Sequence, residues 1–470
     1  MTADLAHSTA AQLSRLFRRG KASPVEAMKA VLKRTATVNP KINALRLIEE
    51  TASLKAARAS ERRWRKGAPL SPLDGVPVSI KELVSVRGWP LTMASKLADH
   101  APRTEDAPAV ARLREAGAIV FAQSTSSEYG HKGVTDSPLN GITRNPWNPA
   151  RTPGGSSGGA AAAVASGMGP LAIGTDGGGS VRLPASFCGI VGHKATYGRI
   201  AAWPPSMNGD LANTGPMART VEDCALMMNA IAQPDPRDPT SLPPDDTDWV
   251  KALKGKLKKL RVGFILRFGD APVEIEVAAA VTRAAKGFAA LGCKVEEAKV
   301  DLMGADQPRA FITHWLTASQ RLLQLHPEAR HGELDPNLLA SGRAGLRFSL
   351  QDLVNAQVER RAIALAWNLF FEKYDLLLTP TVAVTAFPVG QNFPDGADGK
   401  PNRAWVPFTS PFNLSRHPAI SVPCGVSREG LPIGLQIVSG LYRDALVLRA
   451  ARHFTEAYPV PLPILPENAR

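Results

Sequence analysis

The feature that most constrains this sequence is a run of 24 residues, 152–175, without a single charge. Glycine, alanine and serine make up most of it, and Pro170 lies inside it. A membrane-spanning helix of that length would consist mainly of large apolar residues such as leucine and isoleucine. We therefore expect a segment buried in the core of a globular protein, and no association with a membrane.

Chain length and cysteine content limit the class of protein further. At about 150 residues per domain, 470 residues suggest about three domains, although one large α/β domain is equally compatible. The N-terminus has no apolar core followed by a cleavage site, which argues against a signal peptide. The 4 cysteines are scattered without a CxxC pair, which argues against a disulfide framework or a cysteine zinc site. We expect a cytoplasmic protein.

Strand and helix patterns alternate on both sides of a Pro- and Asp-rich connection, 233–248, which we interpret as exposed. Each side has a short β-branched run, an amphipathic or Ala-rich helix and a further strand. This alternation predicts an α/β fold with a large, mostly parallel sheet covered by helices on both faces. The predicted strands are 76–80, 118–122, 170–174, 260–266, 293–300, 374–378 and 434–438, and the predicted helices are 106–117, 157–167 and 273–292.

The net charge of +14 raises nucleic acid as a partner. The basic residues lie mostly in short runs at predicted helices or their edges, around positions 15–21, 58–66 and 251–261. No aromatic residues alternate with them, and no nucleic-acid-binding motif is recognisable. We interpret the runs as solvated helix faces and expect no nucleic acid as a ligand.

Two Gly/Ser-rich segments are the strongest chemical signals. Ser156 lies in Pro-Gly-Gly-Ser-Ser-Gly-Gly at the start of a predicted helix, and Ser180 follows the glycines 177–179. Consecutive glycines allow backbone N–H groups to point into one concavity. Donors fixed in this way form an oxyanion hole, which stabilises the negative charge that develops on a carbonyl oxygen. The pattern therefore favours Ser180 as a nucleophile.

A serine nucleophile needs a base, and none of the 9 histidines lies in a recognisable catalytic motif. The candidate is Lys81, which ends the apolar run Val76–Ile80. Ligands in α/β sheets bind beyond the carboxyl ends of the strands, where this lysine is expected. An ordinary lysine must lower its pKa by roughly 3 units to be half neutral at pH 7, and burial can supply that. Ser156 could pass the proton from Ser180 to Lys81.

In order and spacing, these motifs resemble the amidase signature family. The resemblance rests on Val-Ser-Ile-Lys81, the segment around Ser156, Gly-Thr-Asp-Gly-Gly-Gly-Ser180-Val-Arg-Leu-Pro and Phe-Cys-Gly189. It covers about 23–230 and 374–455, where Gly-Leu-Pro-Ile-Gly-Leu-Gln436 also matches. It implies one α/β/α domain over residues 1–470 with its signature core at about 74–230. Loops at about 305–410 would select the substrate.

The resemblance implies an amidohydrolase that forms an acyl-enzyme without metal or cofactor. Ser180 would be the nucleophile, Ser156 a relay in a cis peptide after Gly155, and Lys81 the base. The N–H groups of residues 177–180 would form the oxyanion hole. Further supporting positions are Ser157, Asp176 and Arg182, the last two being expected to hold the loop.

Substrate and partners follow less directly. The variable loops contain Trp315, Trp405 and Phe408 and few acids, so we expect them, with Thr409, to bind an apolar or aromatic amide, carbamate or ester. Val406 stands where the A subunits of tRNA amidotransferases carry an acidic residue, which disfavours that function and favours a monomer or homodimer. His193, Ala195 and Ala212 are further departures from common family residues.

Two other interpretations remain, and a third fails. Gly154-x-Ser156-x-Gly158 matches the nucleophile elbow of α/β-hydrolases, with His417 or His453 as the base, but it leaves Lys81 and the second serine segment without a role. A non-enzymatic subunit that binds tRNA or a protein partner would account for the positive charge. A Gly-x-Gly-x-x-Ala pattern at 167–172 fails as a dinucleotide site because Pro170 interrupts it and it precedes a strand.

Overall fold

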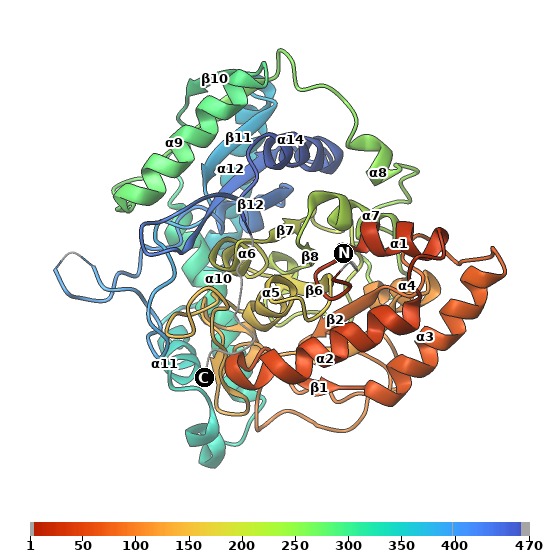
Figure 1. Ribbon diagram of the computed structural model, residues 1–470. Helices are drawn as coiled ribbons and strands as arrows, with labels where there is room; N and C mark the ends of the chain where they lie inside the picture. The colour runs from red at the N-terminus through yellow and green to blue at the C-terminus, as the bar shows by residue number, and fades with distance from the viewer. Residues whose placement is uncertain (1–3, 397, 462–470) are drawn as a thin grey trace.

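A computed structural model describes residues 4–396 and 398–461 of the chain. An 11-stranded sheet runs through the chain (Figure 1). Its strand order is β1-β3-β2-β6-β8-β7-β12-β13-β11-β9-β10. Strands from before and after the 233–248 connection therefore join in one sheet. The strands are β1 Leu45–Ile48, β2 Pro77–Lys81, β3 Ile119–Ser124, β6 Leu171–Asp176, β7 Val191–Lys194, β8 Asn213–Ala218, β9 Arg261–Phe264, β10 Lys294–Glu297, β11 Leu376–Pro380, β12 Ala419–Val426 and β13 Pro432–Ser439.

The predicted α/β class and the large mixed sheet are confirmed, but the expectation of a mostly parallel sheet is corrected. Among the described residues, four neighbouring strand pairs are parallel and six are antiparallel. The parallel pairs lie toward the two sides, where helices follow strands along the chain. The central strands β7, β8 and β12 gave no strand signal because Gly, Pro and Asn, which are poor strand formers, interrupt them.

Helices cover both faces of the sheet, as expected. Successive side chains of a strand point to opposite faces. In β6, Leu171 and Ile173 enter one apolar cluster with residues of α1, α4, α7, α9 and α14, whereas Ala172 enters another with residues of α2, α3 and α5. The helices are α1 Ala10–Arg18, α2 Pro24–Ile42, α3 Glu50–Arg65, α4 Pro108–Glu115, α5 Gly158–Ala165, α6 Arg182–Cys188, α7 Val221–Ile231, α8 Trp249–Ala252, α9 Ile275–Ala290, α10 Gln307–Gln324, α11 Pro336–Gly345, α12 Leu350–Lys373, α13 Pro411–Leu414 and α14 Asp444–Ala457.

The uncharged run is buried, as the sequence predicts. Every residue of α5 lies in the interior. Its composition is explained by close approach, since a Cβ on Gly158 would lie 2.3 Å from the Thr135 hydroxyl, and a Cβ on Gly159 would lie 2.3 Å from the Thr125 hydroxyl. Among the described helices, none is long and apolar enough to cross a membrane.

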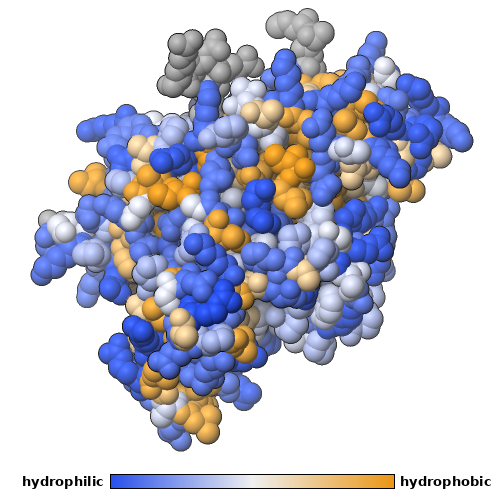
Figure 2. Space-filling model, turned by 90° about the horizontal axis from the view of Figure 1, so that it is seen from below, coloured by the Kyte–Doolittle hydropathy of each residue, from blue (hydrophilic) through white to orange (hydrophobic). Residues whose placement is uncertain are grey.

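In the view of Figure 2, apolar side chains form small groups separated by hydrophilic ones.

Candidate active site

Lys81 is the last residue of β2 and has no solvent exposure. Its Nζ donates hydrogen bonds to the Oγ of Ser156 at 2.7 Å, the Oγ of Ser157 at 2.9 Å and the Oγ1 of Thr175 at 2.9 Å. The strand fixes the start of the side chain, and three neutral hydroxyls hold its end. The sequence predicted the contact between Lys81 and Ser156 but not the one with Thr175, which lies on β6 beside β2.

Burial is the main influence on the charge of Lys81. Loss of hydration lowers the pKa of the Lys81 amine to about 7, and the negative charges of Asp176 and Glu82 oppose part of this effect. All three of its hydrogen-bond partners are hydroxyls, which can accept from the ammonium or donate to the neutral amine. Near neutral pH the group can therefore either take up or release a proton.

Ser156 and Ser157 stand immediately before α5. The peptide bond between Gly155 and Ser156 is cis. The Thr135 hydroxyl donates to the carbonyl of Gly154 at 2.8 Å and accepts from the N–H of Gly158 at 3.0 Å, so it holds the turn on both sides. Ser157 also donates to the carbonyl of Thr175 at 3.1 Å. The two serines are thus held between Lys81 and the glycine segment.

Residues 177–180 form a turn between β6 and α6. Gly179 has φ +133°, and a Cβ there would lie 2.4 Å from the Thr409 hydroxyl, so a larger residue would be strained. The N–H of Gly179 donates to Asp176 at 2.8 Å. Within the described part of the chain, no hydrogen bond is made by the backbone N–H of Gly177, Gly178 or Ser180. These three N–H groups are free for a ligand, whereas that of Gly179, which the sequence also suggested, is already paired.

Asp176 and Arg182 hold this turn as a buried ion pair. Two guanidinium nitrogens of Arg182 donate to the carboxylate at 2.9 and 2.8 Å. Burial alone would raise the pKa of Asp176, but the charge and hydrogen bonds of Arg182 outweigh it, and the pKa lies well below its usual range. Arg182 also donates to Gln436 and Asn413, at 2.8 and 2.7 Å. Residues far along the chain thus support the turn.

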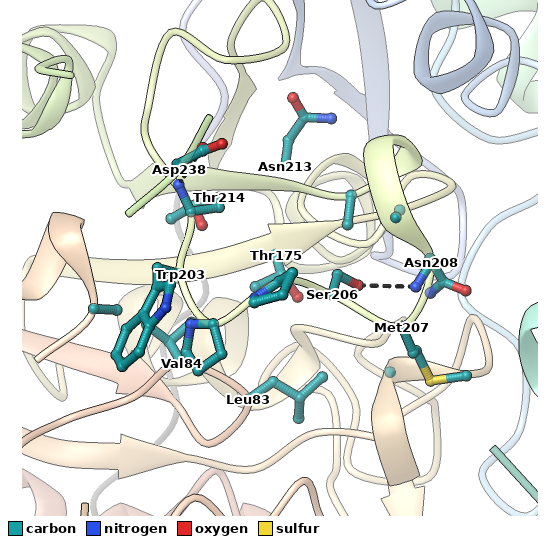
Figure 3. A pocket seen from close by; sticks show the side chains of 18 of the residues that line it. Leu83, Val84, Thr175, Trp203, Ser206, Met207, Asn208, Asn213, Thr214 and Asp238 are labelled. Carbon is teal, nitrogen blue, oxygen red and sulfur yellow. Dashed lines mark hydrogen bonds between the residues drawn. The ribbon is translucent and has the colours of Figure 1, made fainter. Parts of the chain in front are cut away.

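A pocket of about 440 Å³ opens over Ser180, Ser156, Thr175 and Gly177. Ser180 is 7% exposed, and within the described residues its hydroxyl makes no hydrogen bond, so the Ser156–Ser180 contact is not formed here. Such contacts are often long in ligand-free enzymes and tighten when substrate binds. The remaining wall is mostly apolar. It includes Leu83, Val84, Trp203 and Met207 (Figure 3). It also includes Leu91, Met93, Tyr129 and, from helix α10, Trp315.

The structure corrects the expected substrate contacts. Trp315 borders the pocket, but Trp405, Phe408 and Thr409 do not. Trp405 stacks on Phe187 in a buried cluster, with ring centroids 5.9 Å apart, and Phe408 is fully buried. The Thr409 hydroxyl donates to the carbonyl of Gly178 at 2.6 Å. This loop folds inward because its large aromatic rings gain more by burial than by facing solvent, and it supports the glycine turn from behind.

The histidine alternative has no geometric support. The Ser156 hydroxyl is paired with Lys81, and no histidine of the described chain hydrogen-bonds to it. His417 pairs with Ser415 at 2.9 Å, and His453 with the carbonyl of Gly255 at 2.7 Å. Within residues 4–396 and 398–461, no group of three or more His, Cys, Asp or Glu residues is arranged to hold a metal ion. The hydrogen bonds at the site join a lysine to serines.

Fold and site together are those of an α/β enzyme that hydrolyses C–N bonds in amides. The chain belongs to the amidase signature family, as its motifs suggested: the family model described as Amidase matches residues 26–448. It is 38% identical to an acylamidase from Rhodococcus erythropolis over 93% of this chain and 92% of that protein. It is also 35% identical to the A subunit of a glutamyl-tRNA(Gln) amidotransferase from Moorella thermoacetica, over 97% of each. A solved bacterial aryl acylamidase matches with a TM-score of 0.88 and 31% identity, over 96% of both chains.

Proposed function

We propose that this enzyme hydrolyses an apolar or aromatic carboxamide through an acyl-enzyme on Ser180. The observation that carries the proposal is the buried Lys81 amine, with a pKa of about 7, donating to Ser156 at 2.7 Å. A base with its pKa near the working pH has the best balance between being unprotonated and accepting a proton readily. The mostly apolar pocket wall supports an apolar substrate.

In the proposed reaction the Oγ of Ser180 attacks the amide carbonyl, and its proton passes through Ser156 to the neutral Nζ of Lys81. The carbonyl oxygen becomes negative and receives hydrogen bonds from the free N–H groups of Gly177, Gly178 and Ser180. The C–N bond then breaks as the proton returns through Ser156 to the leaving nitrogen. Water attacks the resulting ester by the same proton route, which releases the acid and restores Ser180.

Mutation and labelling test the three roles. Ser180→Ala is expected to abolish hydrolysis and labelling by a fluorophosphonate, and Lys81→Ala to be about as severe, because members of one catalytic unit do not contribute additively. Ser156→Ala retains nucleophile and base and should keep more activity than either. Mass spectrometry of the trapped enzyme locates the acyl group. An adduct on Ser156 or Ser157, or near-normal activity of Lys81→Ala, would show that the roles are wrongly assigned.

The second candidate is one component of a glutamine-dependent tRNA amidotransferase, which the 35% identity to such a protein favours. The mostly apolar pocket wall argues against glutamine as the substrate. Val406, which the family resemblance pointed to, packs against the buried Trp405 cluster and does not line the pocket. We propose that the enzyme acts as a monomer or homodimer in the cytoplasm, without nucleic acid. Purified protein that turns over glutamine far faster than aryl amides, or that needs a second protein for activity, would favour the alternative.

A further inference from the structure

The Pro- and Asp-rich connection, 233–248, forms part of the pocket instead of only joining two halves of the chain. Four consecutive residues of it, 237–240, lie on the pocket wall. They face the same space as Ser180, although they are about 60 residues away along the chain. The connection is thus placed to contact the substrate, a role that its composition does not indicate.

The connection is fixed to the segment after β7, residues 197–203. The N–H of Leu242 donates to the carbonyl of Gly198 at 2.8 Å, and the N–H of Ala202 donates to Asp238 at 2.9 Å. Contact is so close that a Cβ on Gly198 would lie 2.3 Å from the carbonyl oxygen of Thr240. The two segments therefore form one wall of the pocket.

Arg237 and Trp203 meet within this wall. The guanidinium carbon of Arg237 lies 4.9 Å from the ring centroid of Trp203, the geometry of a cation–π contact. The same guanidinium donates to both oxygens of Asp235, at 2.9 and 3.0 Å, and to Glu105 at 2.9 Å. Because two carboxylates already balance its charge, Arg237 is poorly suited to bind an anionic substrate. Its geometry is instead suited to hold the plane of the indole.

Several apolar side chains share the pocket with Trp203, although Arg237, Asp238 and Thr214 also line it. In Figure 3, Trp203 and Val84 lie on one side of the pocket and Met207 on the other, with Leu83 below them. A rigid indole that faces aliphatic side chains across the pocket gives a flat contact surface. Planar aromatic groups gain most from such a surface, because they combine burial of a large apolar area with stacking.

We propose that Trp203, held in position by Arg237, determines specificity by binding the planar apolar part of the substrate. This inference rests on the proposed hydrolysis at Ser180 in the same pocket. It identifies which wall selects the substrate and assigns the connection a part in that selection. The planar group can belong to either the acyl or the amine side of the scissile bond, and the experiment distinguishes the two.

The test compares three amides: benzamide, with the ring on the acyl side; 4-nitroacetanilide, with the ring on the amine side; and butyramide, with no ring. Trp203→Ala is expected to raise KM about tenfold or more for at least one aryl substrate, with kcat within about threefold, because a lost apolar contact affects discrimination on this scale. Trp203→Phe should retain most of the wild-type KM. Butyramide should change less than about twofold. The aryl substrate that is affected shows which side of the bond contacts Trp203.

Arg237 is tested as a positioning residue. Arg237→Gln should raise KM for the affected aryl substrate about two- to fivefold, and Arg237→Lys should restore part of the loss because it keeps a cation over the ring. Arg403→Gln is the matched control, since Arg403 lies 5.0 Å from the ring of Phe393, and neither residue lines the pocket. It should leave all three KM values unchanged.

An equal loss on all three amides in Trp203→Ala, or no loss on either aryl amide, would overturn the inference. A binding measurement tests the role of Trp203 independently of whether the proposed hydrolysis occurs. Calorimetry on Ser180→Ala measures the binding of benzamide and 4-nitroacetanilide without turnover, and Trp203→Ala in that background should weaken one of them about tenfold. If no amide is hydrolysed but this loss is seen, the proposed reaction fails while the role of Trp203 stands.

Discussion

The pH dependence of hydrolysis gives the sharpest test of the proposed base. A fall in the pKa of Lys81 from 10.5 to about 7 corresponds to about 5 kcal/mol of lost stability of the charged form, caused chiefly by burial. The neutral amine would then make up about a tenth of the enzyme at pH 6, half at pH 7 and about nine tenths at pH 8. We therefore expect kcat/KM to rise about fivefold from pH 6 to 7, less than twofold from pH 7 to 8, and to stay level above that.

The assay is the initial rate of 4-nitroacetanilide hydrolysis between pH 5.5 and 9.5 at constant ionic strength. Reported as kcat/KM, it reflects ionisation of the free enzyme. Lys81→Arg is the informative variant, because arginine keeps its charge at all these pH values and cannot act as the base. It should lower the rate about 10²- to 10⁴-fold, the usual contribution of a general base.

A second buried lysine provides the control. Burial and the charge of Arg182 also lower the pKa of Lys194 to about 7, yet its Nζ donates to the carbonyl of Ala195 and to none of the serines at the site. Lys194→Met should therefore keep the inflection near pH 7. A wild-type rate that climbs tenfold per unit up to pH 9, or an inflection that disappears in Lys194→Met, would refute the assignment of Lys81 as the titrating base.

Three further predictions concern stability and the glycine turn. The pKa of Lys81 is lower in the folded than in the unfolded protein, so between about pH 7 and 10.5 the unfolded chain binds more protons and wild-type stability rises with pH. Urea titrations should therefore show that the stability of Lys81→Met, relative to wild type, falls by about 1 kcal/mol per pH unit from pH 7 to 9.5. A difference that stays constant with pH would contradict this. Arg182→Met leaves Asp176 buried without its cation and should destabilise the protein by about 3–5 kcal/mol in the same titrations; a loss below 1 kcal/mol would mean that the ion pair is not essential to the fold. Gly179→Ala should abolish most activity, because its Cβ would lie 2.4 Å from the Thr409 hydroxyl. Gly88→Ala is the control, since Gly88 also has a positive φ but lies in open space, and this variant should leave activity unchanged. Equal kinetics of the two variants would contradict the prediction.

The sequence was sufficient for the features that depend on local pattern. An apolar run ending in Lys81 predicted a strand with a buried lysine at its carboxyl end, and the structure has both. The uncharged run around Ser156 predicted burial because charges are rarely tolerated in an interior. Glycines before Ser180 predicted a turn with free N–H donors, which Gly177 and Gly178 provide. In each case a few adjacent residues are enough to determine the strand, the burial or the turn.

Long-range contacts could not be predicted in the same way. Asn413 and Gln436 reach Arg182 from more than 200 residues away, and no local pattern encodes a partner at that distance. Loop composition was misleading as well. Trp405 lies in a loop expected to contact substrate, yet its ring is buried against Phe187.

What the sequence by itself determined was the α/β class, the family and the expected chemistry of a lysine and two serines, because strand and helix periodicity and short motifs are local properties. Only the tertiary structure decided that antiparallel strand pairs fill the middle of the sheet and that the N–H of Gly179 donates a hydrogen bond to Asp176. It also placed the connection containing Arg237 on the pocket wall beside Trp203. Strand order and loop packing minimise the free energy of the whole chain, so residues distant in sequence determine them together.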